Sequence, residues 1–396
     1  MTIIAYGLLG FTVLAILLHI STITIAAIRC RVSAARVPEH DWPPVTIIRP
    51  VCGLDEVERA TLASTFALDA ANVEVLFCCA TTHDPAVPYL RHLIAQNGHF
   101  NARLLIGLER HSCNPKLDNL TKGWREAKHD WIILSDSNLD LPPDYVARVM
   151  AGWRSGTGLV SAPPIGSHPL NFWAVVECAF LNTYQARWQY TADCVGFGFA
   201  QGKTLAWRRA DLDRWGGITA LGQELAEDAA ATKIVRTAGR HVHLAGPGFA
   251  QPLGHRTPSQ VWNRQARWAT LRKLSFPLFF MPEVLTGVVP PIFAAVVAAG
   301  LLDVPPTSPI MLSLLVAVWF GSEAVLARAA GWHLTWASPV AWLLRDLMIA
   351  PIWLSAWASS GYQWHGATIS TIDTEATRLQ DVGATVPAGG PMSESI

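Results

Sequence analysis

Three acidic residues stand at positions where carboxylates commonly do chemistry. Asp84 follows the second short apolar run of the chain, Asp136 directly follows the apolar run 131–134, and Asp228 lies in the first turns of an expected helix. Strand ends of this kind bind ligands in open α/β sheets, and carboxylates there can hold cations or accept protons. Each residue also has a purely structural explanation: a turn before Pro85, a turn or N-cap cluster at Asp136, or compensation of a helix dipole at Asp228.

The segment around Asp136 has the composition of a cation site. Asp136 and Asn138 are spaced i and i+2 at a strand end, so their side chains face the same way. Oxygen ligands hold Mg²⁺ or Mn²⁺, and such a cation can clamp a diphosphate. The sequence therefore predicts a divalent-cation site at Asp136 and Asn138, in which Asn138 is the weaker ligand because it carries no charge.

A basic and aromatic group follows near residue 270. Arg264 and Trp268 share one face at helical spacing, with Arg267 beside them. Two guanidiniums can bind a diphosphate bidentately, and an indole can form a wall of the site. A helix that lies on a membrane surface would also carry Arg and Trp, so this group alone leaves both interpretations open.

Two function classes are excluded. Gly202-Lys203-Thr204 resembles the end of a phosphate-binding P-loop, but Phe197 stands where that loop needs glycine, so the chain is not a P-loop NTPase. The formal net charge is zero, which disfavours a nucleic-acid partner.

The elements that must position these residues alternate between short apolar runs and helical patterns. This alternation predicts an α/β domain with a mainly parallel sheet over residues 41–272. The expected strands are 45–48, 73–79, 104–106 and 131–134, and the expected helices are 60–68, 89–97 and 223–237.

A membrane anchor precedes this domain. Hydrophobic residues make up 51% of the chain and charged residues 15%, against about 25% charged in ordinary soluble domains. The apolar run 3–28 is long enough to span a bilayer. Arg29, Arg31 and Arg36 follow it, so the positive-inside rule places the next segment in the cytoplasm. We predict an anchor at 1–30 in the cell inner membrane and a cytoplasmic catalytic domain.

A second membrane block is expected at 276–360. Runs 284–302 and 309–327 look long enough to span, whereas run 337–358 contains Arg345 and Asp346 and could instead be interfacial. Two to three spans would make the protein multi-pass. The tail, 361–396, is expected to be partly disordered because its end is rich in Gly, Ser and Pro.

The order of these motifs is more specific than any one of them. The chain resembles the inverting glycosyltransferases with the pattern D, D-x-x, D, (Q/R)-x-x-R-W, and more narrowly family 21, the ceramide glucosyltransferases and their bacterial relatives. The finer marks are Ile47-Ile48-Arg49-Pro50 with Gly53, His83-Asp84-Pro85-Ala86, Asn114-Pro115-Lys116-Leu117-Asp118-Asn119-Leu120, Asp136-Ser137, Ala226-Glu227-Asp228 and Arg264 to Trp268.

The resemblance implies a GT-A-type, Rossmann-like catalytic domain and a role for each matched residue. Asp84 would contact the uracil or ribose of a UDP donor, and Asp136 would bind the metal and diphosphate. Asp228 would be the base that deprotonates the acceptor hydroxyl. The remaining residues would bind the phosphates or close the site: Lys116, Arg264, Arg267 and Trp268.

The sequence departs from the family pattern in two respects that matter for function. The second acidic motif is only D-x-N, and Lys203 belongs to a pair, Gly202-Lys203, that replaces a less basic one. The resemblance implies transfer of one hexose, preferably glucose, from a UDP-sugar to a membrane lipid, with ceramide favoured. Diacylglycerol or hopanoid acceptors, a UDP-glucuronic acid donor and a processive polysaccharide synthase are the enzymatic alternatives. A catalytically dead scaffold is the non-enzymatic one.

Overall fold

The computed structural model describes residues 1–34, 42–69, 72–108, 110, 112, 114–302, 309–358, 361–364 and 367–370. Arg36 and the end of the predicted disordered tail, 371–396, lie outside these residues.

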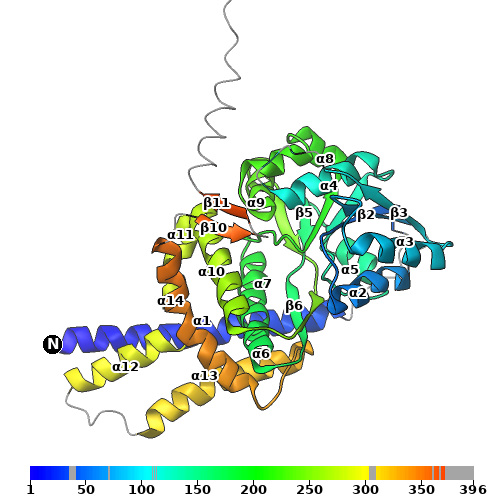
Figure 1. The fold of residues 1–396 in the computed structure, drawn as a ribbon. Coiled ribbons are helices and arrows are strands. Elements are labelled where there is room, and N and C mark those ends of the chain that lie inside the picture. Colours follow the sequence, from blue (N-terminus) through cyan, green and yellow to red (C-terminus); the bar gives the residue numbers. More distant parts are fainter. Residues whose placement is uncertain are drawn as a thin grey trace, which may run out of the picture.

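A seven-stranded sheet forms the centre of the domain (Figure 1). Its strand order is β3-β2-β1-β4-β7-β5-β8. Strand β7 runs antiparallel to both of its neighbours, whereas the other pairs are parallel, so the sheet is mixed. The strands are β1 (Val45–Val51), β2 (Val73–Cys79), β3 (Asn101–Ile106), β4 (Trp131–Ser135), β5 (Thr157–Ser161), β7 (Thr204–Arg208) and β8 (His241–Leu244).

Both faces of the sheet are covered, which explains why its central strands are largely apolar and buried. Ile47 and Ile48 are fully buried on opposite faces of β1. Ile47 packs in the cluster that includes α3 (Ala86–Gln96) and α5 (Tyr145–Ala151). Ile48 packs in the cluster that includes α4 (Pro115–Glu126) and α9 (Glu227–Thr237).

The predicted elements match with shifted boundaries. Strand β3 begins three residues before the predicted 104–106 run, and the predicted helix 60–68 is α2 (Glu56–Ala63) followed by the 3₁₀ turn η1 (Ser64–Ala67). The predicted helix 223–237 starts only at Glu227, because residues Ile218–Gln223 form the 3₁₀ turn η3.

A second layer connects this domain to the apolar helices. It contains the two-stranded parallel sheet of β6 (Pro164–Pro169) and β9 (Phe249–Gly254). A long helical segment crosses it, formed by α6 (Phe172–Ala179), the π-helical turn η2 (Phe180–Ala186) and α7 (Arg187–Cys194). The other elements are α8 (Arg209–Arg214), α10 (Pro258–Ser275), β10 (Gly361–Trp364) and β11 (Ala367–Ser370).

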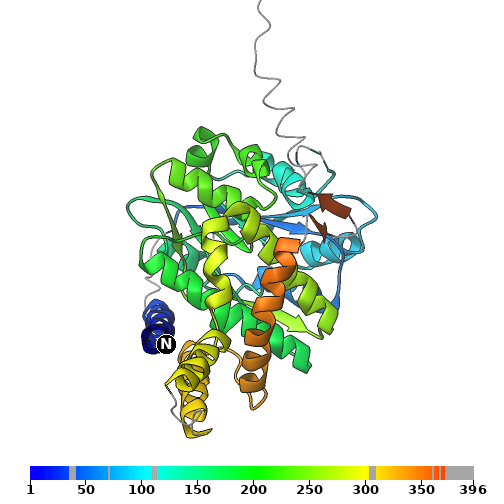
Figure 2. The same ribbon diagram turned by 90° about the vertical axis from the view of Figure 1, so that its left-hand side faces the viewer.

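Three helices of the described chain are long and apolar enough to cross a membrane. They are α1 (Thr2–Ala34), α13 (Pro309–Ala330) and α14 (Ser338–Ala358). Helices α1 and α13 pack together, and α14 packs along α10 (Figure 2). The predicted anchor and the runs 309–327 and 337–358 therefore each correspond to one such helix.

The run 284–302, which looks long enough to span, is not one continuous helix. Its helix, α12 (Val289–Leu301), has only 13 residues, and it is bent by 52° from the preceding α11 (Pro277–Phe280) and η4 (Met281–Leu285). The bend lies at residues 286–288, and Pro290 and Pro291 follow in the first turn of α12, where proline favours a helix start. The pair is a broken span or a re-entrant segment.

The charges inside the run 337–358 are paired. Arg345 lies 2.8 Å from Glu323 of α13 and 2.7 Å from Asp346, and all three side chains are buried. Asp346 also accepts a hydrogen bond from the Val288 amide, just before α12. Buried ion pairs of this kind are how apolar helices carry ionisable residues.

Candidate active site

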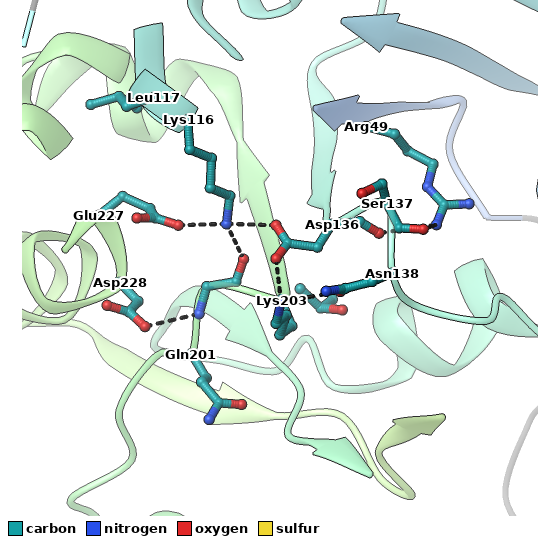
Figure 3. A network of polar contacts seen from close by, with 12 residues as sticks. Arg49, Lys116, Leu117, Asp136, Ser137, Asn138, Gln201, Lys203, Glu227 and Asp228 are labelled. Atoms are coloured by element: carbon teal, nitrogen blue, oxygen red, sulfur yellow. Dashed lines mark hydrogen bonds and ion pairs between the residues drawn. The ribbon is translucent and has the colours of Figure 1, made fainter. Parts of the chain in front are cut away.

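The end of β4 and the start of β7 bring two opposite charges together. Ser135 pairs with Thr204 in the antiparallel ladder, and the next amide, that of Asp136, donates to the Lys203 carbonyl at 3.1 Å. Asp136 and Lys203 are therefore cross-strand neighbours. Their side chains meet: Lys203 Nζ donates to Asp136 Oδ2 at 2.7 Å and to Asn138 Oδ1 at 3.1 Å (Figure 3).

A second ammonium group lies on the other oxygen of Asp136. Lys116 Nζ is 2.6 Å from Asp136 Oδ1 and 2.5 Å from Glu227 Oε1, and it donates to the Gly202 carbonyl at 2.7 Å. Burial alone would raise the pKa of Asp136, but Lys116 and Lys203 outweigh burial and lower this pKa to about 2. Asp136 is thus a permanent anion held between two cations.

The N-terminus of α4 explains the N-P-K motif. Asn114 caps the helix by accepting hydrogen bonds from the amides of Lys116 and Leu117, and Pro115 occupies the first turn, where no amide is needed. The Asn114 amide nitrogen also donates to Glu227 at 2.9 Å. The motif therefore fixes the start of the helix and the carboxylate that faces Lys116.

Asp228 lies in the first turn of α9 beside this network. Its Oδ2 accepts from the Gly202 amide at 3.0 Å, and its Oδ1 accepts from the Ala229 amide at 2.8 Å. Burial and the neighbouring Glu227 raise the pKa of Asp228 to about 6. A carboxylate with this pKa is well suited to accept a proton near neutral pH.

Arg49 organises the turn that carries Asp136. This fully buried guanidinium on β1 donates to the carbonyls of Asp136 and Ser137 at 3.0 Å each and to that of Leu139 at 2.8 Å. It also donates to the Thr61 carbonyl at 2.8 Å. The Arg49 of the I-I-R-P motif is therefore a structural anchor for the site.

The basic and aromatic group lies on α10, as its spacing predicts. The Arg264 guanidinium stacks over the Trp268 ring at 4.8 Å. It also forms an ion pair with Glu177 of α6, which is fully buried and accepts from Arg256 Nε at 3.0 Å. Glu177 thus fixes the position of Arg264.

Asp84 takes a different place from the other predicted residues. Its carboxylate accepts from the Gly53 amide at 3.1 and 3.2 Å and from the Ala86 amide at 2.9 Å. Asp84 is not among the residues that line the main cavity of the site, although Cys52, next to Gly53, does line it. The other predicted site residues all line this one cavity: Lys116, Asp136, Asn138, Asp228, Arg264, Arg267 and Trp268.

The cavity has a volume of about 1320 Å³ and reaches the apolar helices. Its polar end contains the network of Asp136 and Asp228. Its other walls include Leu14 and Leu18 of α1 and Phe279 of α11, whose apolar side chains are exposed. One continuous space therefore joins charged groups to a surface suited to hydrocarbon.

Comparison with known proteins identifies the family. The model of glycosyl transferase family 21 matches residues 14–376. The chain belongs to glycosyl transferase family 21.

Curated relatives of this family-21 chain include ceramide glucosyltransferases. It is 27% identical over 250 residues to ceramide glucosyltransferase 1 of Caenorhabditis elegans, a match that covers 63% of this chain and 54% of the relative. It is 25% identical over 364 residues to ceramide glucosyltransferase 3 of the same organism, covering 90% of this chain and 79% of the relative. The chain thus spans only about half the length of the first of these relatives.

Among solved structures, a mannosyltransferase from Pyrobaculum calidifontis in complex with GDP-Man and Mn²⁺ aligns with a TM-score of 0.47 and 14% identity. The alignment covers 86% of this chain and 99% of the other.

The expected membership in family 21 is confirmed by the family model. The bacterial origin and the role of each site residue stay predictions.

The predicted cation ligands are already engaged by an ammonium group in this family-21 chain. Asp136 and Asn138 do lie side by side, but Lys203 Nζ is bonded to both, and Lys116 is paired with the second oxygen of Asp136. No cluster of three His, Cys, Asp or Glu residues that could hold a metal ion occurs in the described part of the chain. Because two ammonium groups already contact both carboxylate oxygens of Asp136, this donor set fits a divalent cation poorly as it stands.

Sequence reasoning missed Glu177 and Arg256. A signal for Glu177 was available, because it is a lone carboxylate in the otherwise apolar segment Phe172–Ala179, and a buried carboxylate requires a cationic partner. No local signal marked Arg256, which lies 79 residues away from Glu177 in the chain.

Proposed function

We propose that this protein transfers a single hexose, with glucose favoured, from a UDP-sugar to a hydroxyl group of a membrane lipid, with inversion at the anomeric carbon. A ceramide-type acceptor is favoured because the curated relatives are ceramide glucosyltransferases. The observation that carries the proposal is the single cavity that joins the charged network to the apolar helices.

The shape of the cavity supports a lipid acceptor. A lipid hydroxyl must reach the reaction centre while its hydrocarbon chains stay out of water. The exposed apolar side chains of Leu14 and Leu18 line the cavity on α1, one of the helices long enough to cross a membrane. The acyl chains can therefore stay against α1 while the headgroup approaches Asp228, and burying them there is favourable by about 0.8 kcal/mol per methylene group.

Asp228 is the proposed general base. In its ionised form it accepts the proton of the acceptor hydroxyl as that oxygen attacks the anomeric carbon. The new glycosidic bond forms as the bond from the anomeric carbon to the diphosphate oxygen breaks, and UDP leaves. A pKa near 6 keeps Asp228 ionised at neutral pH yet basic enough to assist the transfer.

The cationic side chains are proposed to hold the donor. Negative charge grows on the diphosphate as the sugar leaves, and Lys116, Arg264 and Arg267 line the cavity where positive charge can stabilise it. Trp268 would close this end of the site. Asp84 is proposed to contact the uracil or ribose through the segment that it holds at Gly53.

The proposed location is the cytoplasmic face of the cell inner membrane. Arg29 and Arg31 follow the apolar part of α1, and the positive-inside rule places this end of the helix in the cytoplasm. A cytoplasmic catalytic domain has direct access to nucleotide sugars.

Product analysis tests the proposed function. Membranes that contain the protein are incubated with radiolabelled UDP-glucose, UDP-galactose, UDP-glucuronic acid or UDP-N-acetylglucosamine, each with ceramide or diacylglycerol. We expect one labelled sugar on ceramide, highest with UDP-glucose. A labelled polymer would indicate a polysaccharide synthase. Labelling of diacylglycerol alone would identify diacylglycerol, and not ceramide, as the acceptor.

The substitution Asp228→Asn tests the mechanism. Loss of a general base lowers the rate by about 10²- to 10⁴-fold, whereas the exposed Asp69→Asn serves as the matched control and should leave it unchanged. Full transfer activity in Asp228→Asn would show that Asp228 is not the base.

A further inference from the structure

We propose that the Lys203 ammonium group takes the place of the expected divalent cation. The enzyme would then bind the donor diphosphate and transfer the sugar without a metal ion. For the transfer step this proposal rests on the proposed function. The test of UDP binding does not depend on which lipid is the acceptor.

The position of Lys203 is the first argument. Its Nζ lies 2.7 Å from Asp136 Oδ2 and 3.1 Å from Asn138 Oδ1, which are the two oxygens that the sequence predicts as cation ligands. Figure 3 shows Lys203 beneath Asp136 with both contacts drawn. The ammonium group thus occupies the point between the two side chains from which a bound cation would contact both.

The number of donors on each lysine is the second argument. An ammonium group has three N–H donors. Lys116 Nζ donates to Glu227 and to the Gly202 carbonyl and forms an ion pair with Asp136 Oδ1 at 2.6 Å, so three oxygens already surround it and it would act on a diphosphate mainly through its charge. Lys203 Nζ contacts two oxygens and lines the cavity, which leaves its third N–H for a phosphate oxygen.

Electrostatic repulsion is the third argument. A dication on Asp136 would lie within contact range of both lysines. The side chains of Lys116, Lys203 and Asp136 are only 17%, 14% and 16% exposed, so water screens such repulsion weakly. Because Lys116 and Lys203 both pair with Asp136, this carboxylate attracts a further cation only weakly.

The fold holds Lys203 in this place. Its carbonyl accepts the Asp136 amide hydrogen, and the next residue, Thr204, is in the β4–β7 ladder. A metal ion could enter only if the lysine left both oxygens, and the cross-strand pairing keeps its backbone beside them. Lys203 is therefore a built-in cation rather than a flexible surface lysine.

The first experiment compares transfer with and without metal. Purified full-length protein is assayed with UDP-glucose and ceramide in excess EDTA, then with added Mg²⁺ or Mn²⁺. We expect rates that agree within about twofold, and calorimetric affinity for UDP that does not change with metal. Loss of wild-type transfer or UDP binding in EDTA, restored by Mn²⁺, would overturn the proposal.

The second experiment removes the ammonium group. In EDTA, Lys203→Ala should weaken UDP binding by roughly 10- to 100-fold, the usual worth of a hydrogen bond to a charged group. Mn²⁺ should restore part of this loss, because Asp136 and Asn138 are then free to bind it. Lys203→Arg should keep metal-independent binding, and Lys128→Ala, an exposed lysine, is the matched control.

The outcomes separate the two proposals. A Lys203→Ala protein that binds UDP as the wild type does in EDTA contradicts the role of Lys203, and size-exclusion and tryptophan fluorescence show whether the variant is folded. If UDP binds without metal but no lipid is glycosylated under any condition, the proposed function fails while the role of Lys203 stands.

Discussion

The substitution Glu177→Gln tests how Arg264, which is proposed to bind the diphosphate, is positioned. Glu177 is fully buried on α6 and pairs with Arg264 through one oxygen and with Arg256 through the other, at 3.0 Å. Glutamine has nearly the same shape, but it loses the charge and turns one oxygen into an amide donor that faces a guanidinium. The change therefore removes the electrostatic support of both arginines without opening a cavity.

The expected magnitude follows from burial. Removing one partner of a buried ion pair costs about 3–5 kcal/mol. Arg256 and Arg264 are 25% and 16% exposed, so solvent lowers the expected cost to about 2 kcal/mol. For a domain of this size, about 2 kcal/mol corresponds to a fall in Tm of roughly 4–8 °C.

The functional effect is separable from the loss of stability. An Arg264 that is no longer held in place loses part of a charged hydrogen bond to the donor, which we expect to raise the KM for UDP-sugar by roughly tenfold. Steady-state kinetics at a temperature well below the lowered Tm would give KM and kcat separately, and calorimetry with UDP would give the affinity. The matched control is Glu126→Gln, because Glu126 is 55% exposed and forms a single surface pair with Arg103.

Two results would refute this reasoning. An unchanged KM with a lowered Tm would mean that Glu177 only stabilises the fold. A lowered KM would mean that Glu177 competes with the donor for Arg264, which is the opposite of positioning it.

Further predictions concern the base, the sheet and the cavity. The rate of transfer should rise with pH through about 6, because the proposed base Asp228 acts as the carboxylate and its pKa is raised to about 6. A pH profile of kcat/KM measures this rise. A flat profile in that range would exclude Asp228 as the titrating base. Gly123→Ala should lower the stability by about 1–3 kcal/mol in thermal unfolding, because the added Cβ would lie 2.6 Å from Ile48 and 2.9 Å from Cys78; an unchanged Tm would show that the core repacks. Leu14→Gln should raise the KM for ceramide and leave UDP binding unchanged, and equal effects on both would argue against a lipid path along α1.

Local patterns predicted four of the seven strands of the central sheet, β1 to β4, and missed β5, β7 and β8. Strand β2 is buried at all seven positions, and its apolar sequence, interrupted only by Glu74, was a reliable signal. The start of α9 was less predictable, because residues just before it form a 3₁₀ turn whose composition also suits a helix. The break before α12 was missed because an apolar run reports length in sequence and gives no information on the 52° bend.

The sequence by itself determined the long apolar helix near residues 3–28, the alternation of strands and helices, and the residue types at the ends of strands, because hydrophobic periodicity and capping act over a few residues. It also marked Asp136, Asp228 and Arg264 as candidate site residues, and the family resemblance added Lys116. Only the tertiary structure decided what each of them touches. Asp136 and Lys203 are separated by 67 residues and meet because β4 and β7 pair antiparallel, and Glu177 reaches Arg264 across 87 residues because α6 packs on α10. Contacts at such separations depend on strand pairing and helix packing, and for this reason the ammonium group at the predicted cation site could not be read from the sequence.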